Sequence, residues 1–421
     1  MPDHIVPPRP MAADRPGVTY DTDAASGDRS ESQQPAWAEK AIMLSTGPLF
    51  LLAFSAVIPG LPRIEAALAH GPRDGILIKQ LVGIVGLSVA VGAPLAGFLI
   101  DRIGPRVILA VTSGLYALAG TAGLLIHGLP LLVASRALVG VAAGAIDTTA
   151  LVLINTRLRA DEQAKWMGLH MSALMIFSIV SQPVIGDLAA IGWRYPFALY
   201  VLGLPVGVIG AMGLHDRRPR RSTVVRPEGG RIAASFPVRL ALLALALGTV
   251  SYSVAIYGPY LITARGVADP GRIALVIMGQ SAISAAFSMA YGRCRRRLSV
   301  SGVFAISLAA AAAGCLMAAV SSGFWGAVWG LLIVAIGLAW FFPNLATAVG
   351  QAVPASQQGR VLGFVRTGFE ISATLCVIWL EPISRRFGPA GAFVSISLLA
   401  WVLLAAFGVV AAFGAHAARK A

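Results

Sequence analysis

Long runs of apolar residues dominate this sequence after residue 40, and they constrain the fold more than any other feature. A helix needs about 20 mostly apolar residues to cross the hydrocarbon core of a bilayer. Hydrophobic residues make up 57% of the chain and charged residues only 12%, too few to coat a water-soluble globule. We therefore expect an all-α membrane protein with twelve transmembrane helices. The expected spans are Ala41–Pro59, Gln80–Ile100, Val107–Ile126, Leu129–Ile154, Trp166–Leu188, Phe197–Leu214, Leu240–Ile262, Ile273–Tyr291, Val303–Val320, Trp325–Val349, Val361–Leu380 and Ala392–Phe413.

The polar segments divide the chain. The first 39 residues are rich in Pro, Asp, Ser and Gln, with no apolar core and no basic stretch leading into an apolar one, so we expect a disordered tail rather than a signal peptide. The longest loop separates the sixth and seventh spans. The expected organisation is a tail (1–39), a first six-helix half (40–214), a linker (215–239), a second six-helix half (240–416) and a short tail (417–421).

The basic residues orient this arrangement. Of 33 Lys and Arg residues, 23 fall on the side of the termini and the 215–239 linker, eight on the opposite side and two inside spans. The positive-inside rule then predicts that both termini and the linker are cytoplasmic. The net charge of +14 is thus mainly an orientation signal, and because the bases are scattered between apolar runs we expect no nucleic-acid partner.

The two halves resemble each other. At an offset of 195 residues, the segment Gln163–Gly168 aligns with Gln358–Gly363, and Gly97 aligns with Gly292. Six spans repeated in the same orientation are related by an axis along the membrane normal. Such an arrangement places a central site between the halves and suits alternating access, in which the site opens to one side of the membrane at a time.

The loop Gly97–Arg106 carries the most specific motif. It matches the pattern G-x-L-x-D-R-x-G-R-K at Gly97, Leu99, Asp101, Arg102, Gly104 and Arg106, with Pro105 in place of the first base of the closing pair. This loop resembles the signature of the major facilitator superfamily. Arg136, Gly140 and Gly144 resemble its R-x-x-x-G-x-x-x-G motif, and Gly192-Trp193-Arg194 its entry to the sixth span.

The resemblance implies a secondary transporter of the inner membrane of bacteria, most like the twelve-span drug:proton antiporter branch, and not an enzyme. It implies no cofactor, with the proton gradient as the energy source. Its partners would be the lipid bilayer, protons and a small-molecule substrate, and we expect a monomer. The antiporter motif G-P-x-x-G-G is matched only at Pro183 and Gly186.

The signature loop could hold one conformation closed. Asp101 at a helix exit would face the positive N-terminus of the eleventh span, near Gly359–Val361, as the family suggests. Gly97 would permit a close helix approach, and the bases would bind acids or phospholipid head groups. The expected latch comprises Gly97, Asp101, Arg102, Gly104 and Arg106. The alternative is an ordinary basic turn, which would not explain an acid among the bases.

Ionisable residues within spans are costly and usually functional, and four stand out here. Arg136 and Asp147 share one face of the fourth span, and Arg366 and Glu370 are one turn apart in the eleventh. All four are proton-coupling candidates, because a carboxylate in low dielectric binds a proton readily. The alternatives are a structural ion pair for either acid and snorkelling for Arg136, whereas the lone His170 is expected to pack or snorkel.

Aromatic and amide side chains indicate the substrate. In the resembling family the cavity is lined by the first, fourth, seventh and tenth spans. The cavity candidates on this basis are Phe50, Phe54, Tyr252, Tyr257, Trp340, Phe341 and Asn344, although packing is the simpler explanation for at least half of such residues. Aromatic walls with a few polar groups suit amphipathic molecules.

The sequence leaves three functions open. Proton-coupled efflux of a small amphipathic or drug-like compound is favoured, and proton-coupled symport of an organic anion or metabolite would be favoured if Arg136 and Arg366 both faced the cavity. A non-transporting membrane sensor is the third. The sequence contains no Walker A motif, so it does not indicate ATP as the energy source. The three cysteines, Cys294, Cys315 and Cys376, do not have the spacing of metal ligands.

Overall fold

The computed structural model describes residues 37–71, 73–214 and 235–420, and this part of the chain is helical throughout, with no strand. Residues 1–36 of the expected N-terminal tail and residues 215–234 of the expected linker lie outside it. The helices are α1 (Trp37–Ser55), α2 (Leu61–Leu68), α3 (Asp74–Ile103), α4 (Pro105–Thr121), η1 (Ala122–Leu124), α5 (Leu129–Arg157), α6 (Ala160–Ile191), η2 (Tyr195–Leu202), α7 (Gly203–Gly213), α8 (Ser235–Ala264), α9 (Pro270–Arg295), α10 (Val300–Val320), α11 (Phe324–Ala339), α12 (Phe341–Ala352) and α13 (Ala355–Lys420).

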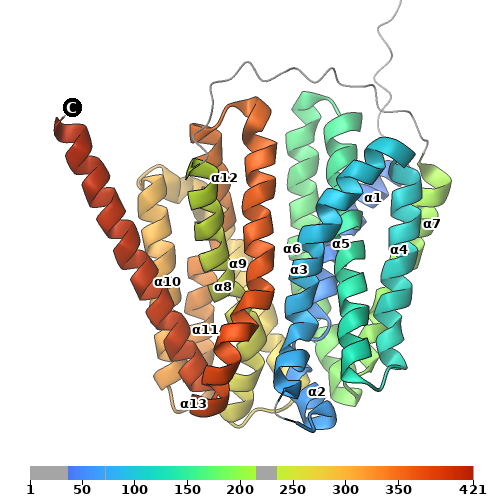
Figure 1. Ribbon diagram of the computed structural model, residues 1–421, viewed down its shortest axis with the longest axis horizontal. Coiled ribbons are helices and arrows are strands. Elements are labelled where there is room, and N and C mark those ends of the chain that lie inside the picture. Colours follow the sequence, from blue (N-terminus) through green and yellow to red (C-terminus); the bar gives the residue numbers. More distant parts are fainter. Residues whose placement is uncertain (1–36, 72, 215–234, 421) are drawn as a thin grey trace, which may run out of the picture.

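Within the described residues, ten helical segments are long and apolar enough to cross a membrane. In lipid a segment must satisfy its own backbone hydrogen bonds, which is why such apolar runs become helices. One of the ten, Gln357–Ala406, has 50 residues. At 1.5 Å per residue it would measure about 75 Å, far more than one bilayer crossing. Gly388 interrupts it with φ 71° and ψ 177°, and the chain folds back there (Figure 1).

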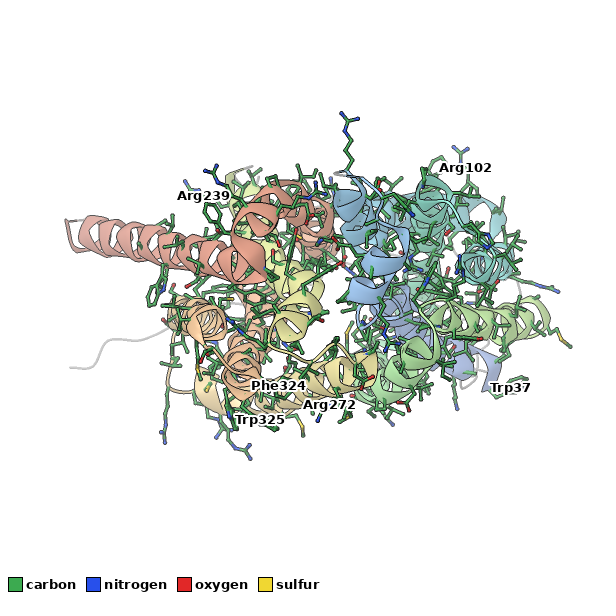
Figure 2. The ribbon with its side chains drawn as sticks, turned by 90° about the horizontal axis from the view of Figure 1, so that it is seen from below. Trp37, Arg102, Arg239, Arg272, Phe324 and Trp325 are labelled. Carbon is green, nitrogen blue, oxygen red and sulfur yellow. The ribbon has the colours of Figure 1, made fainter. Side chains whose placement is uncertain are left out.

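The helices gather into two groups. α1–α7 form one and α8–α13 the other, as both the side view and the view along the helix axes show (Figures 1 and 2). Arg102 and Arg239 lie on opposite groups (Figure 2). We call the end of the bundle where α7 ends and α8 begins the linker end, and the opposite end, which carries α2, the α2 end.

Glycines set how closely the helices pack. A Cβ at Gly140 of α5 would lie 2.6 Å from the carbonyl oxygen of Val85 and 2.7 Å from Cβ of Ser88, both on α3. A Cβ at Gly144, one turn further along α5, would similarly lie 3.0 Å from the carbonyl oxygen of Val89 on α3. Small residues at such crossings let two backbones approach, which is the main source of helix association in lipid.

The two groups pack tightly at the α2 end and separate towards the linker end. On α3, a Cβ at Gly83 would lie 2.7 Å from the carbonyl oxygen of Ala373 of α13, and one at Gly86 would lie 2.8 Å from the Ala373 side chain. Near the linker end, in contrast, the Cβ positions of Gly97 on α3 and of Gly359 and Gly363 on α13 have no described neighbour within 4 Å beyond their own helix turns.

Replacing Gly140 by Ala tests the α3–α5 crossing. The added methyl group collides with the backbone of α3, so we expect a loss of about 1–3 kcal/mol of stability and a lower Tm in detergent, the usual cost of overpacking. Gly114→Ala in α4 is the matched control, because nothing lies within 4 Å of its Cβ position and Ala is the better helix former. Equal Tm values for the two variants would contradict the close crossing.

Candidate functional site

A cavity of about 460 Å³ lies between the two groups. Its walls come from α1, α3 and α5 on one side and from the first part of α13 on the other. The lining includes Val89, Ala93, Asp147, Gly363, Arg366 and Glu370. Because the α13 lining begins at Gly359, in the second turn of that helix, the cavity occupies the linker-end half of the bundle.

Three of the four predicted intramembrane charges meet at this cavity. Arg366 of α13 donates a 2.9 Å hydrogen bond from Nη2 to Oδ2 of Asp147 on α5, and its Nε lies 3.9 Å from Oε1 of Glu370. Both acids are buried, whereas the Arg366 side chain is 36% exposed. Tyr252 of α8 donates a 2.6 Å hydrogen bond to Oε2 of Glu370. One guanidinium therefore bridges two acids from opposite helix groups.

His170 is a member of this cluster that the sequence did not identify. It lies on α6, is fully buried, and has Nε2 at 3.2 Å from Oδ1 of Asp147 and Nδ1 at 2.7 Å from the carbonyl oxygen of Met43. Gly47 of α1 leaves room for the ring, since a Cβ there would lie 3.2 Å from it. The available signal was a histidine within an apolar span, which packing explains equally well.

An aromatic layer borders this cluster. The ring centroids of Phe50 and Phe54 on α1 lie 5.4 Å apart, and the Phe54 ring lies 5.7 Å from that of Tyr252 on α8. Tyr252 in turn lies 5.3 Å from Phe369 of α13. The Arg366 guanidinium lies 4.8 Å from the Phe50 ring centroid, within cation–π range. Of the seven predicted cavity residues, Phe50 lines the cavity.

Four of the other predicted cavity residues make contacts away from the cavity lining in the described structure. Tyr257 is buried with its hydroxyl 3.3 Å from Glu381. Trp340 donates from its indole nitrogen to the carbonyl oxygen of Phe287 at 2.7 Å, and Phe341 stacks on Phe369. Asn344 accepts a 3.1 Å hydrogen bond from Tyr291 and donates a 2.9 Å one to the carbonyl oxygen of Val300. These contacts hold Trp340 and Asn344 within the α8–α13 group.

Arg136 lies apart from the charged cluster. It is fully buried and donates to the hydroxyl of Tyr200 at 2.5 Å, to the carbonyl oxygen of Leu81 at 3.2 Å and to that of Ala53. Its guanidinium also lies 5.0 Å from the Tyr200 ring centroid. It therefore ties α1, α3, α5 and η2 together instead of reaching an end of its helix.

A second charged cluster, missed from the sequence, joins the groups at the α2 end. The buried Lys79 ammonium of α3 lies 2.9 Å from Oε2 of Glu65 on α2 and 3.1 Å from Oε2 of Glu381 on α13. Arg385 binds the other oxygen of Glu381 at 2.9 Å. The Lys79 ammonium also lies 4.3 Å from the ring centroid of Tyr260. Hydropathy assigned Lys79 to a loop, because a buried and paired lysine is indistinguishable in sequence from a solvated one.

The predicted latch residues surround the turn between α3 and α4. Asp101, Arg102 and Arg106 are exposed, and Arg102 lies 4.1 Å from the ring centroid of Phe98. Gly104 has φ 88° and joins the two helices, a conformation that favours glycine. The structure records no hydrogen bond between Asp101 and the described part of α13, so the latch stays a prediction.

Ten apolar membrane-length helices that enclose a charged, partly open cavity define a multi-pass integral membrane protein in the described part of the chain. The model of the Major Facilitator Superfamily matches residues 44–375, and the chain belongs to this family. Members of this family are transporters of small molecules and not enzymes, and they need no cofactor.

Two curated relatives illustrate the similarity. The chain is 24% identical over 373 residues to the inner membrane transport protein YajR of Escherichia coli, covering 85% of this chain and 79% of that protein. It is 28% identical over 177 residues to the quinolone resistance protein NorA of Staphylococcus aureus, a match that spans 42% of this chain and 44% of NorA. The chain thus matches less than half the length of NorA.

Solved transporter structures share the fold. The nucleoside transporter NupG superposes with a TM-score of 0.72 at 11% identity, covering 88% of this chain and 99% of NupG. A bacterial homologue of the human lysosomal transporter Spinster gives a TM-score of 0.70 at 16% identity, covering 89% and 96% of the two chains.

The contacts of Arg136 predict a structural effect of its replacement. Arg136→Lys keeps the charge but offers a single ammonium in place of a planar fork that serves three acceptors. We expect a lower Tm by the loss of about 2–5 kcal/mol, the cost of leaving buried polar groups unpaired. Tyr200→Phe removes only one acceptor and should cost less. A wild-type Tm for Arg136→Lys would contradict the tie between these helices.

Proposed function

We propose that the protein is a secondary active transporter that works by alternating access and exports a small amphipathic, drug-like compound in exchange for protons. The bridging of Asp147 and Glu370 by Arg366 across the two helix groups carries this proposal. Two buried acids share one cation at the wall of a cavity, so a proton or a cationic substrate arriving there changes which groups remain paired. The matches to NorA and YajR support export and an inner-membrane location.

The proposal includes the architecture expected from the sequence. Twelve spans form two six-helix halves related by an axis along the membrane normal. The ten membrane-length segments, the fold-back at Gly388 and the additional helix α1 support this count. The linker end, with both termini, is proposed to be cytoplasmic, and the protein to act as a monomer.

The uneven packing of the groups supports alternating access. The α2 end is closed by Lys79 and Glu381, and the linker end is open around Gly97 and Gly363. We propose that the described conformation faces the cytoplasm and that the Gly97–Arg106 latch closes in the opposite one. Asp101 would then reach the N-terminus of α13, where helix dipole and backbone donors favour an anion.

One alternative receives less support. The hypothesis of organic-anion symport would gain support if both intramembrane arginines faced the cavity. Arg366 lines the cavity, but Arg136 donates to carbonyl groups away from the cavity. A non-transporting sensor remains distinguishable by experiment, since it would tolerate loss of the intramembrane acids.

Proteoliposomes with an imposed pH gradient test the coupling. With ethidium as a planar aromatic cation, and a quinolone as a second probe, we expect Asp147→Asn and Glu370→Gln each to lower gradient-driven accumulation by at least about tenfold, since each removes a proton acceptor. The exposed Asp187→Asn is the matched control and should behave as wild type. Unchanged accumulation in both acid variants would defeat proton coupling, and inward transport of an anion with protons would replace export by symport.

Lys79→Met tests the closure of the α2 end. Without the ammonium, Glu65 loses its ion-pair partner and Glu381 keeps only Arg385 and the Tyr257 hydroxyl, so the closed conformation loses stability. A loss of about 1.4 kcal/mol already shifts the equilibrium tenfold. We expect faster maleimide labelling, by about tenfold or more, of a cysteine placed at the buried Val377 in a Cys294→Ser background. Lys165→Met, at an exposed site, is the control, and equal labelling rates would refute the closure.

A further inference from the structure

The environment of His170 fixes where its protons lie. Nδ1 faces the carbonyl oxygen of Met43 at 2.7 Å, and a carbonyl oxygen only accepts hydrogen bonds. Nδ1 therefore carries a proton and donates it to α1. Nε2, at 3.2 Å from Oδ1 of Asp147, is the only ring nitrogen left to change its protonation.

The contact between Nε2 and Asp147 requires one proton. A neutral imidazole with its proton on Nδ1 would present a lone pair to a carboxylate oxygen, and two acceptors repel each other. One proton between them makes the contact favourable, either on Nε2 as an imidazolium or on Oδ1 as a carboxylic acid. Arg366 decides between these two, because its 2.9 Å hydrogen bond to Oδ2 favours the ionised carboxylate.

The charges of the whole cluster agree with this assignment. The groups that face His170 and Asp147 are the Met43 carbonyl from α1 and Arg366 from α13, and Arg366 also approaches Glu370, which accepts from Tyr252 of α8. With both acids ionised, Arg366 supplies one positive charge against two negative charges. A protonated His170 makes the total neutral, and a buried cluster avoids a net charge.

We propose that His170 is the proton-holding partner of Asp147, so that the pair stores the one proton that the transporter exchanges. This inference rests on the proposed proton-coupled function. His170 is sealed from the cavity, whereas Asp147 lines it, so the proton reaches the imidazole through the carboxylate. While Arg366 binds Asp147, the proton stays on Nε2.

When Arg366 leaves, the proton passes from Nε2 to Oδ1. The N–H bond breaks, an O–H bond forms, and the products are a neutral imidazole, still donating from Nδ1 to Met43, and a neutral carboxylic acid. Release of that proton to water regenerates the carboxylate. A cationic substrate that contacts Asp147 replaces the lost charge, so one proton exchanges for one positive charge.

Nitrogen NMR of the full-length protein, labelled with ¹⁵N at its histidine rings, tests the assignment directly. The two ring nitrogens of an imidazolium resonate close together, whereas those of a neutral tautomer are widely split. His170→Gln identifies the signal among the six histidines. We expect an imidazolium in the wild type at about pH 7 and a neutral Nδ1–H tautomer in Asp147→Asn. A neutral His170 in the wild type would overturn the inference, whether or not the protein transports with protons.

A transport measurement provides the second test of the role of His170. In proteoliposomes with ethidium, the ratio of gradient-driven accumulation to substrate counterflow isolates coupling from folding and binding. We expect His170→Gln to lower this ratio at least about tenfold and to flatten its pH dependence, since an amide donates without changing charge. The exposed His127→Gln should keep the wild-type ratio. A wild-type ratio and pH profile in His170→Gln would refute the role of His170, whereas an uncoupled wild type would refute the proposed function itself.

Discussion

The hydrogen bond between Arg366 and Asp147 joins the two helix groups at the wall of the cavity, and the other polar contacts of the cluster depend on it. Without it, the buried Asp147 would keep His170 as its side-chain partner, and a buried carboxylate that loses a charged partner is strongly destabilised. The bond also holds α13 against α5 at this depth. A movement of the groups that separates these helices leaves Asp147 without Arg366, so that Asp147 needs a proton or another cation in its place.

A second ion-pair contact between the two helix groups lies further along α13. Glu381, which binds Lys79 at the α2 end, is about 22 Å from Arg366 along a regular helix. Between them, Gly83 and Gly86 of α3 already contact α13, while the Cβ positions of Gly97 of α3 and Gly359 and Gly363 of α13 have no described neighbour within 4 Å beyond their own helix turns. The same two helices thus carry a closed glycine contact at one end and an open one at the other. Rocking about the central ion pair would exchange them, which gives the predicted latch at Gly97 its place in the proposed cycle.

The sequence predicted the helices well because hydropathy reflects the demand of lipid on the backbone, and α5 begins at Leu129 as expected. It placed the start of α3 at Gln80 instead of Asp74, because the residues before Gln80 include Lys79, whose pairing with Glu65 and Glu381 is invisible without a structure. The ion-pair partners were predicted only in part, since Arg366 does approach Glu370, at 3.9 Å. Spacing suggested Glu370 as the partner of Arg366, whereas the shorter contact reaches Asp147, 219 residues away in the chain.

The two intramembrane arginines show why position in the sequence does not determine the role of a charge. Arg136 donates to two backbone carbonyls and a tyrosine hydroxyl, acceptors that do not change charge, so its bonds make α1, α3, α5 and η2 move together. Arg366 instead binds carboxylates, and a carboxylate that accepts a proton loses the charge that attracts a guanidinium. A rigid group and an exchangeable contact between groups are both needed for alternating access. In the proposed cycle Arg136 would supply the first and Arg366 the second, because their acceptors differ.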